Sequence, residues 1–302
     1  MEIVRNLKII PNLSLALGFF DGLHLGHQKV IGNAVGFARQ NGTKSAVVTF
    51  SNHPFCYLQG VKAPKYILTN SDKYKMLETL GVDYVVELDF EEIKTLSARD
   101  YLENILVKYF SPKFITSGLQ HHFGSCRSGN ADLLTKFQSE FGYEYVPVSE
   151  LFLDGVKISS TSIRNFIGNG EIEHAEKMLG RKFSITGIVR QGKQKGRTIG
   201  FPTANILYPE GIIQPPHGVY DVDVLINAKK YRGISNFGTC PTITNGEVTT
   251  FETHILDFEA DLYGKEIRVE FNKKIRDEKK FDNIDELKHQ IQLDIDGLSD
   301  SE

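Results

Sequence analysis

The chain has 302 residues, 40% of them hydrophobic and 24% charged, and a formal net charge of −3 at pH 7. This length and composition are typical of a globular protein with one large domain or, as we expect, two. The nearly neutral charge, without a basic stripe, argues against a nucleic acid as partner.

The first half of the chain alternates predicted strands and helices. Short apolar runs predict the strands, and apolar residues at helical spacing predict the helices. Such alternation is typical of a parallel sheet with helices on its faces, where ligands bind at the carboxyl ends of the strands. The predicted strands are 14–20, 45–50, 83–90, 113–116 and 143–148, and the predicted helices are 27–42, 71–81 and 98–110.

The pattern changes near residue 180, after which the chain is rich in strands. Apolar and charged residues alternate from Ile267 to Phe271, as in a strand with one buried face. We predict a small all-β barrel with helix 283–295 packed on it, and domains 1–182 and 183–302. The predicted strands are 183–192, 218–227, 231–238, 249–258 and 265–276, with turns at 227–230 and 263–264.

Three cysteines, Cys56, Cys126 and Cys240, lie far apart and form no Cys-x-x-Cys pair. This usage favours a reducing compartment over a disulfide framework. The N-terminal segment lacks the apolar core of a signal peptide, and the longest apolar runs are too short to span a membrane. We therefore expect a cytoplasmic protein with no membrane partner. The sequence does not give its oligomeric state.

The segment 18–28, GFFDGLHLGHQ, directly follows the first predicted strand. A turn from a strand into a helix presents free backbone N–H groups and the positive end of the helix dipole to a phosphate. His24 and His27 share one face of a first helical turn, where they could stabilise phosphate charge. The alternative is a glycine-rich surface loop with two solvated histidines. The further candidate nucleotide-binding residues of this loop are Gly18, Phe20, Asp21, Gly22 and Gly26.

The segment 158–165, ISSTSIRN, contains a second candidate for phosphate binding. Its hydroxyl groups could serve only to cap the helix that follows. Together with Arg164 they could instead hold a triphosphate. The candidate hydroxyl residues are Ser159, Ser160 and Thr161.

These two segments together resemble the nucleotidyltransferase superfamily, and more closely the adenylyltransferase module of bacterial FAD synthetases. In the second half, GRTIGFPTANI, GVYDVDV, SNFGTCPTI, FETHILDFEADLYGKEIRVEF and IRDEKKFDNIDELKHQIQLDI resemble the riboflavin kinase module in order. The whole chain thus resembles the bifunctional riboflavin kinase/FAD synthetase family. The resemblance implies a Rossmann-like α/β nucleotidyltransferase domain of the HxGH type before a riboflavin kinase barrel. It also implies Mg²⁺, ATP as co-substrate, and riboflavin, FMN and FAD as substrates and products.

The resemblance implies roles for single residues of the second half. By this resemblance Thr203 and Asn205 are expected to bind Mg²⁺, an ion that hydroxyl and amide oxygens suit. Glu252 becomes the base for the ribityl 5′-hydroxyl, and Arg276 lies near flavin and phosphates. Each could instead be a solvated or turn residue. The segment 190–200 is expected to form a flap over the nucleotide. Its candidate binding residues are Gly192, Gly196 and Gly200, together with the nearby Pro202.

The first half departs from the family pattern at five positions. A phenylalanine stands where the family usually has a phosphate-binding arginine, and a usual carboxylate of the metal side is an asparagine. Three potential zinc ligands, His121, His122 and Cys126, lack a fourth, so we expect no zinc site. The departures are Asn52, Phe55, Gln120, His121 and Asn130.

Three functional hypotheses follow. The first is phosphorylation of riboflavin to FMN in the barrel and adenylation of FMN to FAD in the first domain. The second is a monofunctional riboflavin kinase with a degenerate adenylyltransferase domain. The third is a non-enzymatic flavin-binding regulator, which the combination of Thr203, Asn205 and Glu252 disfavours.

Overall fold

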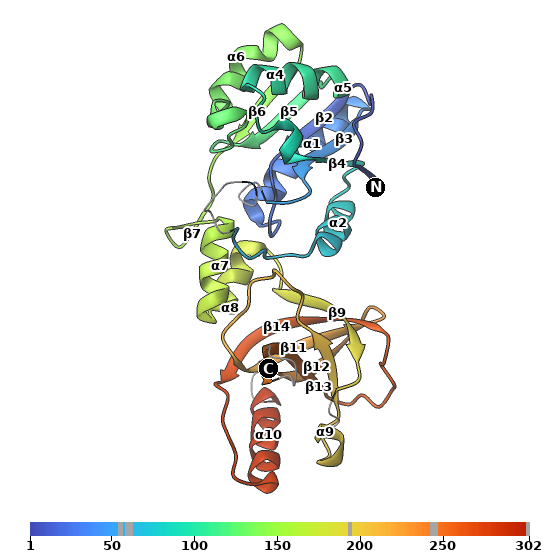
Figure 1. The fold of residues 1–302 in the computed structure, drawn as a ribbon, viewed down its shortest axis with the longest axis vertical. Helices are drawn as coiled ribbons and strands as arrows, with labels where there is room; N and C mark the ends of the chain where they lie inside the picture. Colours follow the sequence, from blue (N-terminus) through green and yellow to red (C-terminus); the bar gives the residue numbers. More distant parts are fainter. Residues whose placement is uncertain (54–56, 58–62, 193–194, 242–246, 300–302) are drawn as a thin grey trace. The chain divides into compact units, whose positions relative to one another are not determined.

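The computed structural model describes residues 1–53, 57, 63–192, 195–241 and 247–299. The chain forms two compact units, Met1–Ser160 and Thr161–Glu302 (Figure 1). In this division the helices between residues 160 and 179 group almost entirely with the barrel, whereas the sequence pattern places them with the first domain. The domain limits at residues 182 and 183 stay a prediction.

The first unit is built on a six-stranded sheet in the order β1-β4-β3-β2-β5-β6, with all pairs parallel. Every residue of β2 is buried, because helices cover both faces of the sheet. The strand order reverses between β2 and β5, so the end of β2 is the switch point at which such sheets bind ligands. The strands are β1 (Glu2–Val4), β2 (Leu13–Leu17), β3 (Lys44–Phe50), β4 (Tyr84–Leu88), β5 (Phe114–Gly118) and β6 (Glu144–Val148).

Two buried apolar clusters cover the two faces of this sheet. One contains Ile31 and Leu77 from α1 and α2, and the other contains Leu102 and Leu134 from the helices after β4. The predicted helix 98–110 is observed, but its middle is π-helical. The helices are α1 (Leu25–Asn41), α2 (Asn70–Thr79), α3 (Phe90–Ile93), α4 (Ala98–Tyr101), the π-helix (Leu102–Val107), α5 (Lys108–Phe110), the 3₁₀ turn (Ser125–Arg127) and α6 (Ala131–Phe141). A short hairpin, β7 (Phe152–Leu153) and β8 (Val156–Lys157), precedes α7.

The second unit is a closed barrel in the order β10-β13-β12-β11-β14-β9 (Figure 1). Aromatic residues fill its interior, where the rings of Phe251 and Phe271 stack at 5.2 Å and Tyr220 meets Phe271 edge-on. The predicted all-β barrel and its final helix are therefore confirmed. The strands are β9 (Ser184–Arg190), β10 (Thr203–Leu207), β11 (Gly218–Ile226), β12 (Lys229–Pro241), β13 (Glu247–Ile255) and β14 (Glu266–Arg276). The helices are α7 (Ser160–Asn169), α8 (Ile172–Leu179), α9 (Lys195–Thr198) and α10 (Ile284–Ser299).

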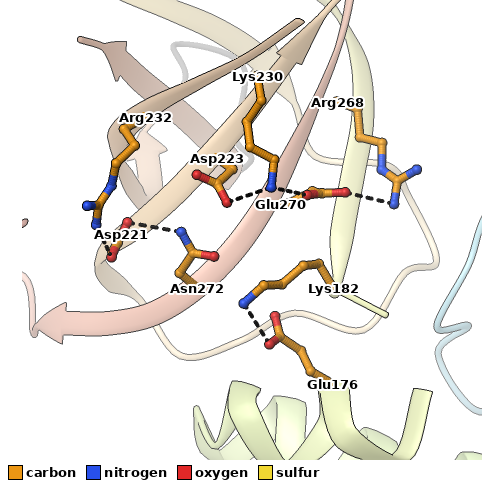
Figure 2. A network of polar contacts seen from close by, with 9 residues as sticks. All are labelled: Glu176, Lys182, Asp221, Asp223, Lys230, Arg232, Arg268, Glu270 and Asn272. Carbon is orange, nitrogen blue, oxygen red and sulfur yellow. Dashed lines mark hydrogen bonds and ion pairs between the residues drawn. The ribbon is translucent and has the colours of Figure 1, made fainter. Parts of the chain in front are cut away.

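A polar network joins three adjacent strands of the barrel, β12, β11 and β14 (Figure 2). The buried carboxylate of Asp221 accepts hydrogen bonds from Arg232 and Asn272, at 3.0 and 3.1 Å. Arg232 also donates to the carbonyl of Leu298 at 3.0 Å. A second chain of ion pairs joins Asp223, Lys230, Glu270 and Arg268. These contacts join β11 to both of its neighbours in the barrel, β12 and β14.

Candidate active sites

The loop between β2 and α1 brings the two predicted histidines together. Helix α1 begins at Leu25, two residues earlier than predicted, and His24 is its N-cap. His24 Nδ1 accepts from the backbone N–H of His27 at 3.3 Å, so the neutral His24 ring carries its proton on Nε2. The two rings stack with centroids 3.6 Å apart. Their spacing therefore places both imidazoles at one helix N-terminus, and their role toward phosphate stays a prediction.

The loop before His24 has an unusual backbone. Phe20, Gly22 and Leu23 have φ angles of 57°, 80° and 42°, in the left-handed region. A Cβ on Gly22 would lie 2.8 Å from Ile67 Cδ1, so glycine is required there for both space and conformation. Asp21, predicted to bind nucleotide, is 6% exposed, and its Oδ1 accepts from the N–H of Ile67 at 3.0 Å. The buried Asp21 carboxylate thus connects the loop to the backbone at Ile67.

The second predicted phosphate element meets this loop through one hydrogen bond. Ser160 Oγ donates to the carbonyl of Asp21, 139 residues away in the chain, at 2.9 Å. Ser159 is its half-buried neighbour. Thr161 and Arg164 lie in α7, in the second compact unit, and their role at the histidine loop stays a prediction.

Two of the altered positions of the first unit, Asn130 and Asn52, make local hydrogen bonds. Asn130 is the N-cap of α6, and its Oδ1 accepts from the N–H of Leu133 at 3.0 Å, as an aspartate oxygen would. Gln120 is exposed, and Asn52 Nδ2 donates to Tyr57 at 3.4 Å. Phe55 lies outside the described residues. Within the described part of the chain, no three His, Cys, Asp or Glu side chains group to hold a metal ion.

Strand pairing in the barrel assembles the candidate kinase residues. The β10–β13 register sets Asn205 opposite Glu252, and the β12–β13 register sets Asn236 opposite Glu252. Residues opposite each other in antiparallel strands point to the same face. Thr203 is two residues from Asn205, and Asn205 Nδ2 lies 3.3 Å from Thr203 Oγ1. The four side chains therefore share the outer face of the barrel, while Ala204, next to Thr203, is buried.

Two cavities meet at this row of side chains. One, of about 580 Å³, is lined by Arg197 and Asn205, and the other, of about 300 Å³, by Glu252 and Arg276. Thr203 lines both cavities. The smaller cavity has apolar walls from Phe201, Phe281, Leu287 and Ile291.

The predicted flap, residues 190–200, packs closely against the side chain of Asn205. A Cβ on Gly192 would lie 2.6 Å from Asn205 Cγ and Oδ1, so the backbone at Gly192 touches this side chain. Gly196 lies in α9 and Gly200 just after it. The carbonyl of Pro202 accepts from His254 Nδ1 at 2.8 Å, which holds the turn that precedes Thr203. Residues 193–194 of the flap lie outside the described residues.

Arg276 lines the smaller cavity but is also committed to an ion pair. Its Nε lies 3.0 Å from both carboxylate oxygens of Asp294, and its second terminal nitrogen lies 2.8 Å from Oδ2. The Asp294 side chain is 3% exposed. Arg276 therefore connects β14 to α10 at the wall of the cavity. Sequence reasoning missed three site residues, Asn236, His254 and Asp294, although all three stand inside the quoted kinase motifs.

Each half of the chain matches a known protein family. A family model described as riboflavin kinase matches residues 179–301, and one described as FAD synthetase matches residues 8–162. A bifunctional riboflavin kinase/FMN adenylyltransferase of Haemophilus influenzae is 36% identical over 301 residues, covering 98% of this chain and 97% of its own. The chain belongs to this bifunctional family.

Further relatives agree over nearly the full length. Proteins with the same name from Escherichia coli K12 and Bacillus subtilis 168 are each 37% identical, covering 96% and 93% of this chain and 94% and 89% of their own. A solved structure titled macrolide-efflux protein, from Streptococcus pneumoniae, covers 98% of this chain and 97% of its own, with 33% identity and a TM-score of 0.88. It is similar to this chain over both units. No helix among the described residues is long and apolar enough to cross a lipid bilayer.

Proposed function

We propose that this chain phosphorylates riboflavin to FMN in its barrel and adenylates FMN to FAD in its parallel-sheet unit. The observation that carries the kinase proposal is the position of Thr203 on both cavities, beside the row Asn205–Glu252–Asn236. A phosphoryl group moving from a nucleotide in one cavity to an alcohol in the other passes this row. The relatives' names supply the two substrates.

Each cavity suits one substrate of the kinase reaction. The smaller one has the apolar and aromatic walls that a flat isoalloxazine ring prefers, and Glu252 lies at its edge. The larger one holds Arg197 and the backbone of Gly192, which suit nucleotide phosphates. Glu252 accepts the proton of the ribityl 5′-hydroxyl as the hydroxyl oxygen attacks the γ-phosphorus of ATP. FMN and ADP are the products.

The residues present fit a magnesium ion. Thr203 and Asn205 offer two hard oxygen atoms, and their side chains already lie within 3.3 Å of each other. Mg²⁺ bound there would neutralise the charge of the ATP phosphates. Glu252, opposite Asn205 in the strand register, lies on the same face of the barrel as this pair.

The first unit offers a different chemistry. In adenylyl transfer the FMN phosphate attacks the α-phosphorus of ATP and pyrophosphate leaves, so no covalent enzyme intermediate is needed. The N-terminus of α1 and the Nε2–H of His24 supply hydrogen bonds and positive potential for the phosphates. We assign His27 and Arg164 to the same charge stabilisation. We keep a cytoplasmic location as a prediction.

One product assay tests both reactions. The purified chain is incubated with Mg²⁺ and ATP, once with riboflavin and once with FMN, and the flavins are separated by chromatography. We expect FMN and FAD from riboflavin, and FAD from FMN. FMN as the sole product would favour the kinase with a degenerate first unit, in line with Asn52, Gln120 and Asn130. Absence of both products would overturn the enzymatic proposal.

A further inference from the structure

A buried lysine lies directly behind the histidine loop of the first unit. Lys73, in α2, is 5% exposed. Its ammonium group donates to the carbonyl of Phe19 at 2.7 Å and to Thr49 Oγ1 at 3.1 Å. Thr49 Oγ1 in turn donates to the same Phe19 carbonyl at 3.0 Å, and the Lys73 nitrogen lies 5.0 Å from the centre of the Phe19 ring. Lys73 thus joins α2 and the end of β3 to the start of the loop.

A buried ammonium group is costly for a protein to keep. Burial lowers the pKa of Lys73 to about 8, while the carboxylates of Asp21 and Glu87 act in the opposite direction. Both carboxylates are themselves nearly buried. Glu87 also accepts hydrogen bonds from Arg5, at 2.9 Å, and from Tyr74. Lys73 therefore loses its proton at a lower pH than an exposed lysine does.

Lys73 binds the backbone immediately before the residues of the loop that have left-handed angles. Phe19 immediately precedes Phe20, the first of the three residues with left-handed backbone angles. His24 follows them as the N-cap of α1. A loop held in such a conformation persists only when its surroundings fix it. Lys73 fixes its beginning, and the hydrogen bond between Asp21 and Ile67 fixes its middle.

We propose that Lys73 is a positioning residue of the adenylyltransferase site, which holds residues 19–24 in place and adds a buried positive charge behind the phosphate loop. The inference rests on the proposed adenylyl transfer in this unit. A buried charge is little screened by salt, so it acts on bound phosphates together with the helix N-terminus.

The test compares Lys73→Met with Lys75→Met. Lys75 lies two residues further along the same helix and is exposed, so the second variant makes the same chemical change away from the loop. We expect K73M to lower kcat/KM for FAD formation from FMN by about 10- to 100-fold, because a misplaced loop costs rate steeply. K75M should keep the wild-type value. Riboflavin phosphorylation by the same preparations should not change.

Two readouts separate positioning from a purely structural role. In the wild type, kcat/KM for FAD formation should fall as the pH rises above about 8, because Lys73 loses its charge. K73M should lack this fall. The deficit of K73M in FAD formation should persist at temperatures well below its own unfolding midpoint, where the chain is folded. That midpoint should lie below that of K75M, because Lys73 donates two buried hydrogen bonds that join α2 and β3 to the loop.

The outcomes are distinct. Equal FAD formation by K73M and K75M overturns the inference about Lys73 and leaves the proposed function intact. A deficit of K73M in FAD formation that appears only near its unfolding midpoint also overturns it, because Lys73 would then only stabilise the fold. If neither the wild type nor K75M forms FAD, the proposed adenylyl transfer fails, and the role of Lys73 falls with it.

Discussion

Replacing Asp294 by asparagine should loosen helix α10 and weaken riboflavin binding at the same time. Asp294 holds the guanidinium of Arg276 through three contacts of 2.8–3.0 Å. Removing one partner of a buried ion pair typically costs about 3–5 kcal/mol. The Arg276 side chain is 21% exposed, and asparagine keeps one carbonyl acceptor. We therefore expect a loss of about 2 kcal/mol in the free energy of unfolding of the barrel unit.

This loss is measurable by thermal unfolding and by steady-state kinetics. About 2 kcal/mol should lower the unfolding midpoint of the barrel unit by about 4–8 °C. Leu287 and Ile291 of α10 form part of the wall of the smaller cavity, so KM for riboflavin should rise. The turnover number should change less, because Glu252 and Thr203 are untouched.

Asp296→Asn is the matched control. Asp296 is an exposed residue of the same helix, and it accepts a hydrogen bond from Gln292 at 2.8 Å. Its replacement should change the free energy of unfolding by no more than about 0.5 kcal/mol. If D294N unfolds at the same temperature as D296N and keeps the wild-type KM for riboflavin, the reasoning about the Arg276–Asp294 pair is wrong.

Two further predictions concern the flap and the pH dependence of stability. Gly192→Ala should lower riboflavin kinase activity, because the added methyl group meets Asn205 at 2.6 Å. Gly36→Ala in α1, where the methyl group meets nothing within 4 Å, should leave that activity unchanged, and equal rates for the two variants would refute the assignment. Burial alone would raise the pKa of Asp83, but hydrogen bonds from Lys44 and Ser45 lower it overall. The stabilisation from Asp83 is thus present above the ordinary carboxyl pKa and lost as the pH falls through the lower folded value. Asp83→Asn should destabilise the chain against denaturant at pH 7 but much less in strong acid, and an equal effect at both pH values would contradict this.

The fold was largely predictable because its signals are local. Alternation of strands and helices in the first half, and period-two patterns in the second, depend on neighbouring residues alone. The strands that escaped prediction are short. β10 has five residues, β1 has three, and β7 and β8 have two each, too few to show a clear period. The π-helical turn at Leu102–Val107 has the same apolar pattern as an α-helix, so the sequence does not distinguish them.

The candidate sites were predictable only in part. His24 and His27 are three residues apart, and Thr203 and Asn205 two apart, so spacing alone brings each pair together. By contrast, Lys73 meets Phe19 across 54 residues.

Asp294 likewise meets Arg276 only once α10 packs on the barrel. Asn236 joins Glu252 through a strand register that the sequence does not specify. Contacts of this kind depend on the tertiary fold. The side chains that surround the predicted site residues therefore do not follow from spacing in the sequence.

The central claim, that each unit carries one reaction, is tested most directly by crossing two variants with two substrates. Glu252→Gln removes the proposed base of the barrel, and His27→Ala removes an imidazole from the phosphate loop of the sheet unit. We expect E252Q to lose riboflavin phosphorylation by about 10²- to 10⁴-fold while it still converts supplied FMN to FAD. H27A should convert riboflavin to FMN normally and form little FAD. If either variant loses both reactions, or if both variants retain both, the assignment of one reaction to each unit is wrong.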